Sequence, residues 1–444
     1  MGVEGGLSHL TSHREDIVQE GSTKTGPPPG LRLTERQIYL FAFANNVAIA
    51  FLYLNLPLRA LALGATALDL GVIGGIWSLA SICSAVLCGR LSDRLGRDRL
   101  MAAGTLIGGL GTLSVLLIPK LPYLFAASIL FGISSALFWP SIEAKVADAS
   151  EDHELGRRLS RFNMSWSSGS GAGTLLSGVL AEQNPALPFC VAAVLFLLLS
   201  LRLTTLLRWG KKEDRQPAHP LQAEPHPHQN KVAAFLFMAR LAHFALSFSI
   251  GSIRWLFPKL AVTLGMQGAT IGVALGMLTG SQVLAYFGMS RVRRWQYTFG
   301  ALLLTLLLPL AGLWVAWSAT TAIGFDVAFF AIGLSGGMAF NMSLFYGVHG
   351  SHTKGGNAGL HEAIGGLGYM LGPLLGGVVA RGLAPGHEPV QRRPRRHRPR
   401  VGERLRGSPA LGERARKGRA HRGIKRRGAE SRAPSVLSSR NPLP

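Results

Sequence analysis

Long apolar stretches separated by short polar segments make up most of this chain. Eleven stretches of about 20 predominantly apolar residues follow one another, and this is the length a helix needs to cross a bilayer. They span roughly residues 37–58, 70–89, 100–119, 121–142, 162–181, 187–207, 232–257, 268–290, 296–318, 321–346 and 357–380. Most are rich in Gly, Ala and Ser, which allow membrane helices to approach closely. The pattern predicts an all-α polytopic membrane protein.

The polar segments between the apolar stretches alternate in their content of Lys and Arg. If the N-terminus is cytoplasmic, the basic segments at 90–99, 145–161, 208–215 and 291–294 all lie inside. The opposite segments contain only Lys120 and Lys259, besides Arg59 at the end of the first span. Because cytoplasmic loops of membrane proteins carry an excess of Lys and Arg, this topology is preferred over its inverse. We expect a multi-pass protein of the cell (plasma or inner) membrane with a cytoplasmic N-terminus.

The chain repeats itself at a distance of about 200 residues. Residues 57–64 (Pro-Leu-Arg-Ala-Leu-Ala-Leu-Gly) recur as 258–265 (Pro-Lys-Leu-Ala-Val-Thr-Leu-Gly), and Gly71 and Gly75 recur as Gly272 and Gly276. Residues 132–135 match 333–336, and the glycine-rich segment 171–178 matches 370–377. One offset, which drifts by two residues, relates all three matches. Self-similarity at a constant spacing indicates two copies of one structural unit.

The repeat divides the chain into five predicted regions. A disordered cytoplasmic arm (1–36) precedes an N-terminal bundle of six helices (37–208). A polar linker (209–231), in which Gly210 to Asn230 include four prolines and three histidines, leads to a C-terminal bundle (232–382) with five recognisable spans. A basic tail (383–444) follows, which we expect to be disordered. Two pseudo-symmetric six-helix bundles are a transporter architecture.

A short motif lies between the second and third spans. Residues 89–99 read Gly-Arg-Leu-Ser-Asp-Arg-Leu-Gly-Arg-Asp-Arg. This segment resembles the major facilitator signature G-x-x-x-D-R/K-x-G-R-R/K, which occupies the same place and the same side of the membrane in that superfamily. The segment after the eighth span, residues 288–294, keeps the basic residues and lacks the acid. The resemblance covers about residues 37–380.

The resemblance implies a secondary transporter that works by alternating access, with a gate on its cytoplasmic side. Asp93 would act as a latch on the start of the eleventh helix near residues 355–357, and Glu143 would complete the network. The predicted gate comprises Gly89, Asp93, Arg94, Gly96, Arg97 and Glu143. A carboxylate is stabilised at a helix N-terminus and by neighbouring arginines. The alternative is that the arginines only orient the protein in the membrane.

Polar residues recur on one side of the first and seventh spans, which by resemblance line a central cavity with the fourth and tenth. Tyr39, Asn46 and Tyr53 are spaced by seven residues, which places them on one helix face. Their repeat equivalents are Arg240, Ser247 and Arg254, with His243 on the same face. Spans four and ten add Trp139, Asn341 and Tyr346.

The two arginines in the seventh span suggest the class of solute. Charged side chains within a membrane are costly and normally face protein or water. We therefore hypothesise a cavity for an anionic or carboxylate-bearing solute. Arg240 and Arg254 could instead extend to the two membrane interfaces. For proton coupling, the candidates are His361, Glu362 and Glu143, and we expect Glu362 to carry the proton. Glu143 and Glu362 could alternatively stay solvated and serve the inner gate.

Composition excludes several other classes of protein. Of the 444 residues 48% are hydrophobic and only 16% charged, too few for the surface of a soluble protein of this length. The net charge of +23 is concentrated in residues 387–444, which hold 18 Lys and Arg against 4 Asp and Glu. That tail could bind anionic lipids or nucleic acid, but we favour an out-of-frame translation that replaces a twelfth helix. One of the other two reading frames would then encode an apolar run of about 20 residues.

No pattern for a metal, a cofactor or ATP is apparent. The chain has no GxxxxGK[ST] loop, and Cys83, Cys88 and Cys190 lie in apolar runs, where we expect them to be small core residues. We expect no enzyme activity and no nucleic-acid partner. The predicted partners are a small-molecule substrate, the lipid bilayer and, for coupling, protons, and we expect a monomer. A transporter-like sensor or scaffold and an intramembrane lipid-modifying enzyme remain alternatives.

Overall fold

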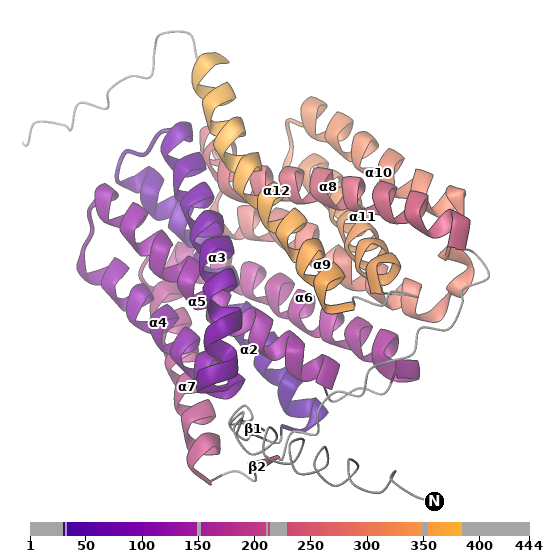
Figure 1. The fold of residues 1–444 in the computed structure, drawn as a ribbon. Helices are drawn as coiled ribbons and strands as arrows, with labels where there is room; N and C mark the ends of the chain where they lie inside the picture. Colours follow the sequence, from indigo (N-terminus) through magenta and orange to yellow (C-terminus); the bar gives the residue numbers. More distant parts are fainter. Residues whose placement is uncertain are drawn as a thin grey trace, which may run out of the picture. The chain divides into compact units, whose positions relative to one another are not determined.

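The computed structural model describes residues 30–31, 33–148, 152–209, 212–213, 229–348 and 354–383, with some side chains, including those of 86–94, left out (Figure 1). Eleven long helices follow in chain order: α2 (Glu35–Ala62), α3 (Ala67–Leu95), α4 (Arg97–Leu117), α5 (Leu121–Asp148), α6 (Asp152–Gln183), α7 (Leu187–Trp209), α8 (Gln229–Thr263), α9 (Gly268–Arg291), α10 (Phe299–Ser318), α11 (Ala322–Val348) and α12 (Lys354–Leu383). A 3-10 turn, η1 (Arg293–Trp295), precedes α10, and the short strands β1 (Gly30–Leu31) and β2 (Lys212–Glu213) pair antiparallel. The predicted N-terminal arm, linker and basic tail lie almost entirely outside the described residues.

Every predicted span is helical, which confirms the all-α membrane fold. Among the described residues, ten helices are long and apolar enough to cross a membrane, and α6 is the exception. α6 packs between α2 and α9, so its Ser and Thr side chains face protein and not lipid. Thr174 and Ser168 also donate hydrogen bonds to carbonyls one turn earlier in their own helix. The polarity of α6 thus reflects its central position.

The two repeats end their first helices in the same way. Pro57 lies within α2 and Pro258 within α8. Gly64 and Gly265, which follow these helices, have φ of +89° and +75°, a conformation that favours glycine. The next residues donate back to equivalent carbonyls, Ala65 to Ala60 and Met266 to Ala261. The sequence match therefore corresponds to matching helix ends.

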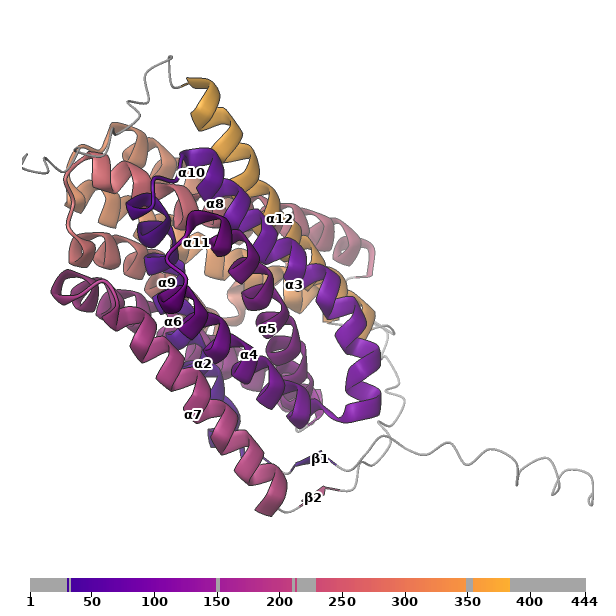
Figure 2. The same cartoon turned by 90° about the vertical axis from the view of Figure 1, so that its left-hand side faces the viewer.

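Two helix pairs join the halves, α6 with α9 and α3 with α12, and they are equivalent by the repeat (Figures 1 and 2). A Cβ added at Gly272 of α9 would lie 2.9 Å from the Thr174 carbonyl oxygen and 3.1 Å from Gly178 Cα of α6. A Cβ at Gly71 of α3 would meet the repeat-equivalent atoms of α12, the Pro373 carbonyl oxygen and Gly377 Cα. Small residues on both helices thus permit backbone contact across the halves. α9 thus contacts α6 through the same repeat positions by which α3 contacts α12, as a pseudo-twofold axis between the halves requires.

Contacts within each half also correspond, with one exception. α2 packs on α6 as α8 packs on α12, and α3 packs on α5 as α9 packs on α11. α7 covers α4 and α2, but no helix in the described part of the chain covers α10 and α8 in the same way. On α10, Trp314 and Trp317 are consequently 75% and 89% exposed. This is the face where a twelfth helix would pack.

The cysteine positions correct one expectation. Cys83 and Cys190 are exposed on the helix bundle and are not core residues, and the side chain of Cys88 lies outside the description. In a membrane protein an apolar neighbourhood in sequence does not imply burial, because lipid-facing positions are apolar too.

Candidate functional site

Arg254 lies between the two halves of the molecule. Its guanidinium carbon is 4.8 Å from the centre of the Tyr53 ring on α2 and 5.7 Å from that of Tyr369 on α12. No carboxylate among the described residues forms an ion pair with it. Cation–π contacts of this kind compensate only part of the cost of a charge removed from water. The site therefore contains a cation that a bound anion would neutralise.

Aromatic rings hold Tyr53 in place. It stacks on Trp77 of α3 with ring centres 4.9 Å apart and lies edge-on to Trp255 of α8 at 6.3 Å. Gly74 allows this arrangement, because a Cβ there would come within 2.6 Å of the Trp255 indole. The cluster joins the N-terminal half to α8 and gives Arg254 a rigid wall on one side.

A small hollow lies beside Tyr369 in the C-terminal half. It is lined by His243, Leu246, Ser247, Ile250, Gln282, Gly336, Phe340 and Tyr369. These residues come from four helices: α8, α9, α11 and α12. His243, Ser247 and Gln282 are buried polar side chains. Tyr369 therefore contacts Arg254 and also lines this hollow, so the two features are neighbours.

Two histidines stack next to the hollow. The rings of His243 and His361 are 4.3 Å apart and nearly parallel, and Phe340 packs edge-on against both. His361 Nδ1 is 2.9 Å from Ser343 Oγ, and its Nε2 is 3.7 Å from Glu362 Oε1. The Glu362 side chain is 54% exposed, whereas that of His361 is 1% exposed. The carboxylate thus projects from a packed imidazole into open space.

Glu143 is the partner of Glu362 from the opposite half. It lies on α5, whereas Glu362 lies on α12, and the two carboxyl groups are close enough for their charges to interact. Two anions that approach one another repel, and this repulsion is relieved when one of them binds a proton. Two of the predicted proton-coupling residues therefore belong to opposite halves and act on each other through their charges.

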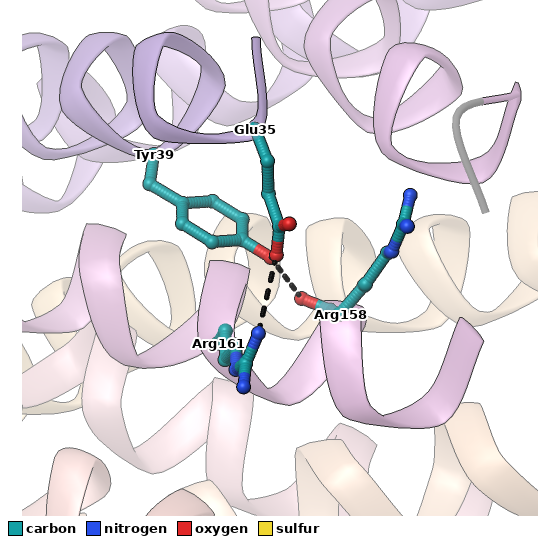
Figure 3. A network of polar contacts seen from close by, with 4 residues as sticks. All are labelled: Glu35, Tyr39, Arg158 and Arg161. Atoms are coloured by element: carbon teal, nitrogen blue, oxygen red, sulfur yellow. Dashed lines mark hydrogen bonds and ion pairs between the residues drawn. The ribbon is translucent and has the colours of Figure 1, made fainter. Parts of the chain in front are cut away.

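Tyr39, predicted to line the cavity, forms part of a different network (Figure 3). Its hydroxyl donates to Glu35 Oε1 at 2.6 Å and lies 3.4 Å from the carbonyl oxygen of Arg158. Arg161 of α6 completes the group with an ion pair of 3.4 Å to Glu35. The network joins the start of α2 to α6, so this hydroxyl is engaged within the protein.

The other predicted cavity residues also contact protein. Asn46 donates to the Trp166 carbonyl at 2.7 Å, and Arg240 donates to Asn357 Oδ1 at 2.7 Å. Trp139 packs edge-on against the rings of Phe138, Phe162 and Trp166. Asn341 contacts the sulfur of Met289, and the Tyr346 hydroxyl accepts a hydrogen bond from the Tyr297 backbone. Of the predicted cavity residues, only Tyr53, His243 and Ser247 lie with Arg254 around the hollow and the ring cluster.

The predicted gate motif is described only in part. The side chains of Asp93 and Arg94 and the surroundings of Gly89 lie outside the description, so the Asp93 latch stays a prediction. Gly96 has φ of +88° and precedes α4, which begins at Arg97, so the motif glycine makes the sharp turn between α3 and α4.

Sequence reasoning missed several residues of this region. Tyr369 and Gln282 lie singly within predicted spans, and only their contacts with other helices distinguish them. An ion pair of 2.8 Å between Lys145 Nζ of α5 and Asp98 of α4 was also missed, although Asp98 falls within the motif segment. Among the described residues, no group of three or more His, Cys, Asp and Glu is placed to hold a metal ion.

Comparison with known proteins gives consistent relatives. The profile of the Major Facilitator Superfamily matches residues 38–373. The quinolone resistance protein NorA of Staphylococcus aureus (strain MRSA252) is 23% identical over 363 residues, covering 78% of this chain and 90% of NorA. Multidrug resistance protein 1 of Bacillus subtilis (strain 168) is 23% identical over 369 residues, covering 78% and 91%.

Solved transporter structures share the fold. A bacterial homolog of the human lysosomal transporter Spinster, inward-facing and unoccupied, aligns with a TM-score of 0.60 at 14% identity, covering 78% of this chain and 81% of that one. The human organic anion transporter MFSD10 aligns with a TM-score of 0.57 at 18% identity, covering 79% and 95%. With the profile match over most of the helical region, these likenesses identify an integral membrane transporter and not an enzyme: the chain belongs to the Major Facilitator Superfamily.

Proposed function

We propose that this transporter performs secondary active transport of a small anionic or carboxylate-bearing solute by alternating access, with Arg254 as the anion-binding residue and Glu362 as the proton carrier. We further propose a monomer in the cell membrane with a cytoplasmic N-terminus, as the loop charges predict. The observation that carries the solute class is the guanidinium of Arg254, which lies between the halves over two tyrosine rings.

In the orientation that we propose from the loop charges, helices of the two halves contact each other at their outer ends. The backbone N–H of Ala269 at the start of α9 donates to Glu182 Oε1 at the end of α6, at 2.7 Å. On the other side of the molecule, Gly71 of α3 meets α12. Alternating access requires these outer contacts to break when the site opens outward. Arg254 lies where such rocking would change its surroundings, since its ring partners belong to different halves.

Several features support an anionic solute over a neutral or cationic one. A charge within the membrane is retained when it has a function, and no described carboxylate neutralises this one. Arginine binds carboxylates in a bidentate, planar geometry. One structural neighbour is named an organic anion transporter, although at 18% identity it shows the fold alone. The weight of the proposal therefore rests on Arg254.

Replacing Arg254 by Gln should weaken binding of aromatic carboxylates by roughly 30-fold or more, because truncating one partner of a buried charge pair leaves the other unpaired. The measurement is a comparison of biphenyl-4-carboxylate with biphenyl-4-carboxamide, by binding to purified protein and by uptake into proteoliposomes. Wild-type protein should prefer the acid, and Arg254→Gln should remove that preference.

Arg291→Gln is the matched control for this experiment. Arg291 also lies over an aromatic ring, with its guanidinium 4.5 Å from the centre of Phe287, but at the exposed end of α9. It should leave the preference for the acid unchanged. Equal binding of acid and amide by wild-type protein would refute the anionic solute. Binding without any flux would instead favour a sensor.

Proton coupling is tested separately through Glu362. Its exposed carboxyl and the neighbouring Glu143 give the transporter a group whose charge depends on protonation and on the distance between the halves. An imposed pH gradient should change the initial uptake rate of wild-type proteoliposomes several-fold, and Glu362→Gln should be insensitive to it. A wild-type rate that ignores the gradient would end this part of the proposal.

A further inference from the structure

Gln282 is a buried amide without a hydrogen-bond partner. It lies in the middle of α9, is 4% exposed, and lines the hollow beside Tyr369. Within the described part of the chain, no group donates to it or accepts from it. Ser247 of α8, which is also buried and lines the same hollow, is equally without a partner there. Neither side chain is among the described polar atoms that are both fully enclosed and unpaired, so the amide and the hydroxyl are accessible from the hollow and can bond a group that enters it.

We propose that His243, Ser247 and Gln282 form an uncharged hydrogen-bonding subsite for a neutral polar group of the transported solute, such as an amide, a carbonyl or a hydroxyl. This inference rests on the proposed function, because it takes the anionic group of the same solute to be bound at Arg254. The subsite would determine specificity among carboxylates.

The position of the subsite relative to Arg254 defines the length of the solute. Ser247 and Arg254 are seven residues apart on α8, so they share one helix face and are separated by about 10 Å along the axis. The ring of Tyr369 borders both, with its centre 5.7 Å from the Arg254 guanidinium carbon. A planar group that extends along this ring would connect the two ends. The fitting solute is therefore an elongated aromatic acid with a neutral polar group at the far end.

The lining also excludes a second charge on the solute. None of the residues around the hollow is Asp, Glu, Lys or Arg. A carboxylate placed there would lose its hydration and could gain an ion partner only if His243 bound a proton, and a charged imidazole is itself unfavourable at a buried position. The subsite should thus accept an amide and reject an acid of the same shape.

Three rigid probes test this directly: biphenyl-4-carboxylate, its 4′-carbamoyl derivative and its 4′-carboxylate derivative. In the two derivatives, the distance between the 4-carboxylate and the 4′ substituent is about the distance between Ser247 and Arg254 along the axis of α8. Equilibrium binding to the purified full-length wild-type protein should be about 3- to 10-fold tighter for the carbamoyl probe than for the parent, which is the net value of a hydrogen bond. The dicarboxylate should bind more weakly than the parent.

Gln282→Leu should abolish the gain from the carbamoyl group, so that the carbamoyl probe and the parent acid bind this variant with equal affinity. Thr279→Val is the matched control, since Thr279 is a buried polar residue one turn away on α9 whose hydroxyl bonds carbonyls of its own helix. The control should keep the carbamoyl preference. The measured quantity is the ratio of the two affinities within each variant, and a smaller fraction of folded protein does not change that ratio.

Gly336→Ala probes the same space without removing a polar group. A Cβ there would lie 3.8 Å from Gln282 Nε2 and 2.7 Å from the flexible end of Ile250. The added methyl should reduce the carbamoyl preference while Gln282 stays intact.

The outcomes separate the two proposals. If wild-type protein binds none of the acids, the anion site at Arg254 fails, and the subsite fails with it. If the parent acid binds through Arg254 but the carbamoyl probe gains nothing, the hollow holds only water and the subsite is refuted. Tighter binding that survives Gln282→Leu would likewise overturn it.

Discussion

An alanine at Gly71 should reduce transport by about fivefold or more and shift the protein toward an outward-open state. The added Cβ would meet the Pro373 carbonyl oxygen and lie 3.3 Å from Gly377 Cα, both backbone atoms that cannot rotate away. Overpacking of this kind typically costs about 1–3 kcal/mol. Because α3 and α12 belong to different halves, separating their outer ends relieves the clash without unfolding either bundle. A penalty of that size changes a two-state population by about 5- to 150-fold.

The measurement is the distance between spin labels at Lys120 and Thr321, on outer turns of different halves, in a background without the native cysteines. Gly71→Ala should increase the population with the longer distance and slow uptake. Gly280→Ala is the control, since a Cβ at Gly280 on α9 would meet nothing within 4 Å. Unchanged distances together with unchanged uptake in Gly71→Ala would contradict the expected rocking motion at this contact.

Replacing Lys145 by Met should lower the free energy of unfolding by about 3 kcal/mol or more, the usual result of removing one partner of a buried ion pair. Lys145 Nζ lies 2.8 Å from Asp98, and the two side chains are 12% and 4% exposed. Asp98 occupies the first turn of α4, where the helix dipole favours an anion, and Lys145 the last turn of α5, where it favours a cation. The pair joins two helices next to the predicted gate.

Thermal unfolding of the purified variants in detergent measures this effect. The double variant Asp98→Asn with Lys145→Met should recover much of the lost stability, because no charge is then left unpaired. Glu35→Gln serves as the control, since the Glu35–Arg161 pair is 3.4 Å long with both side chains at least 40% exposed, and it should change stability by less than about 1 kcal/mol. Equal shifts for Lys145→Met and Glu35→Gln would show that burial does not determine the strength of this pair.

Where the prediction of the site failed, the missing information was long-range. Tyr39, Asn46 and Tyr53 share one helix face in sequence, but Tyr39 and Asn46 bond to α6 and only Tyr53 reaches Arg254. Helical spacing indicates which residues share one face of a helix. It does not indicate which neighbouring helix that face contacts. Gln282 and Tyr369 carry no pattern in sequence, and their importance follows from what other helices place beside them.

The sequence by itself determined the eleven helices, the repeat and the membrane character, because these depend on local apolar length, on glycine at helix ends and on spacing along the chain. It also singled out Arg254, since a charge within an apolar span is conspicuous wherever it points. Only the tertiary structure decided that Tyr53 and Tyr369 flank this arginine, that α6 is polar because it is central, and that Cys83 faces outward. These features result from contacts between helices far apart in the chain, and in a bilayer both buried and lipid-facing positions are apolar, so composition alone does not distinguish them.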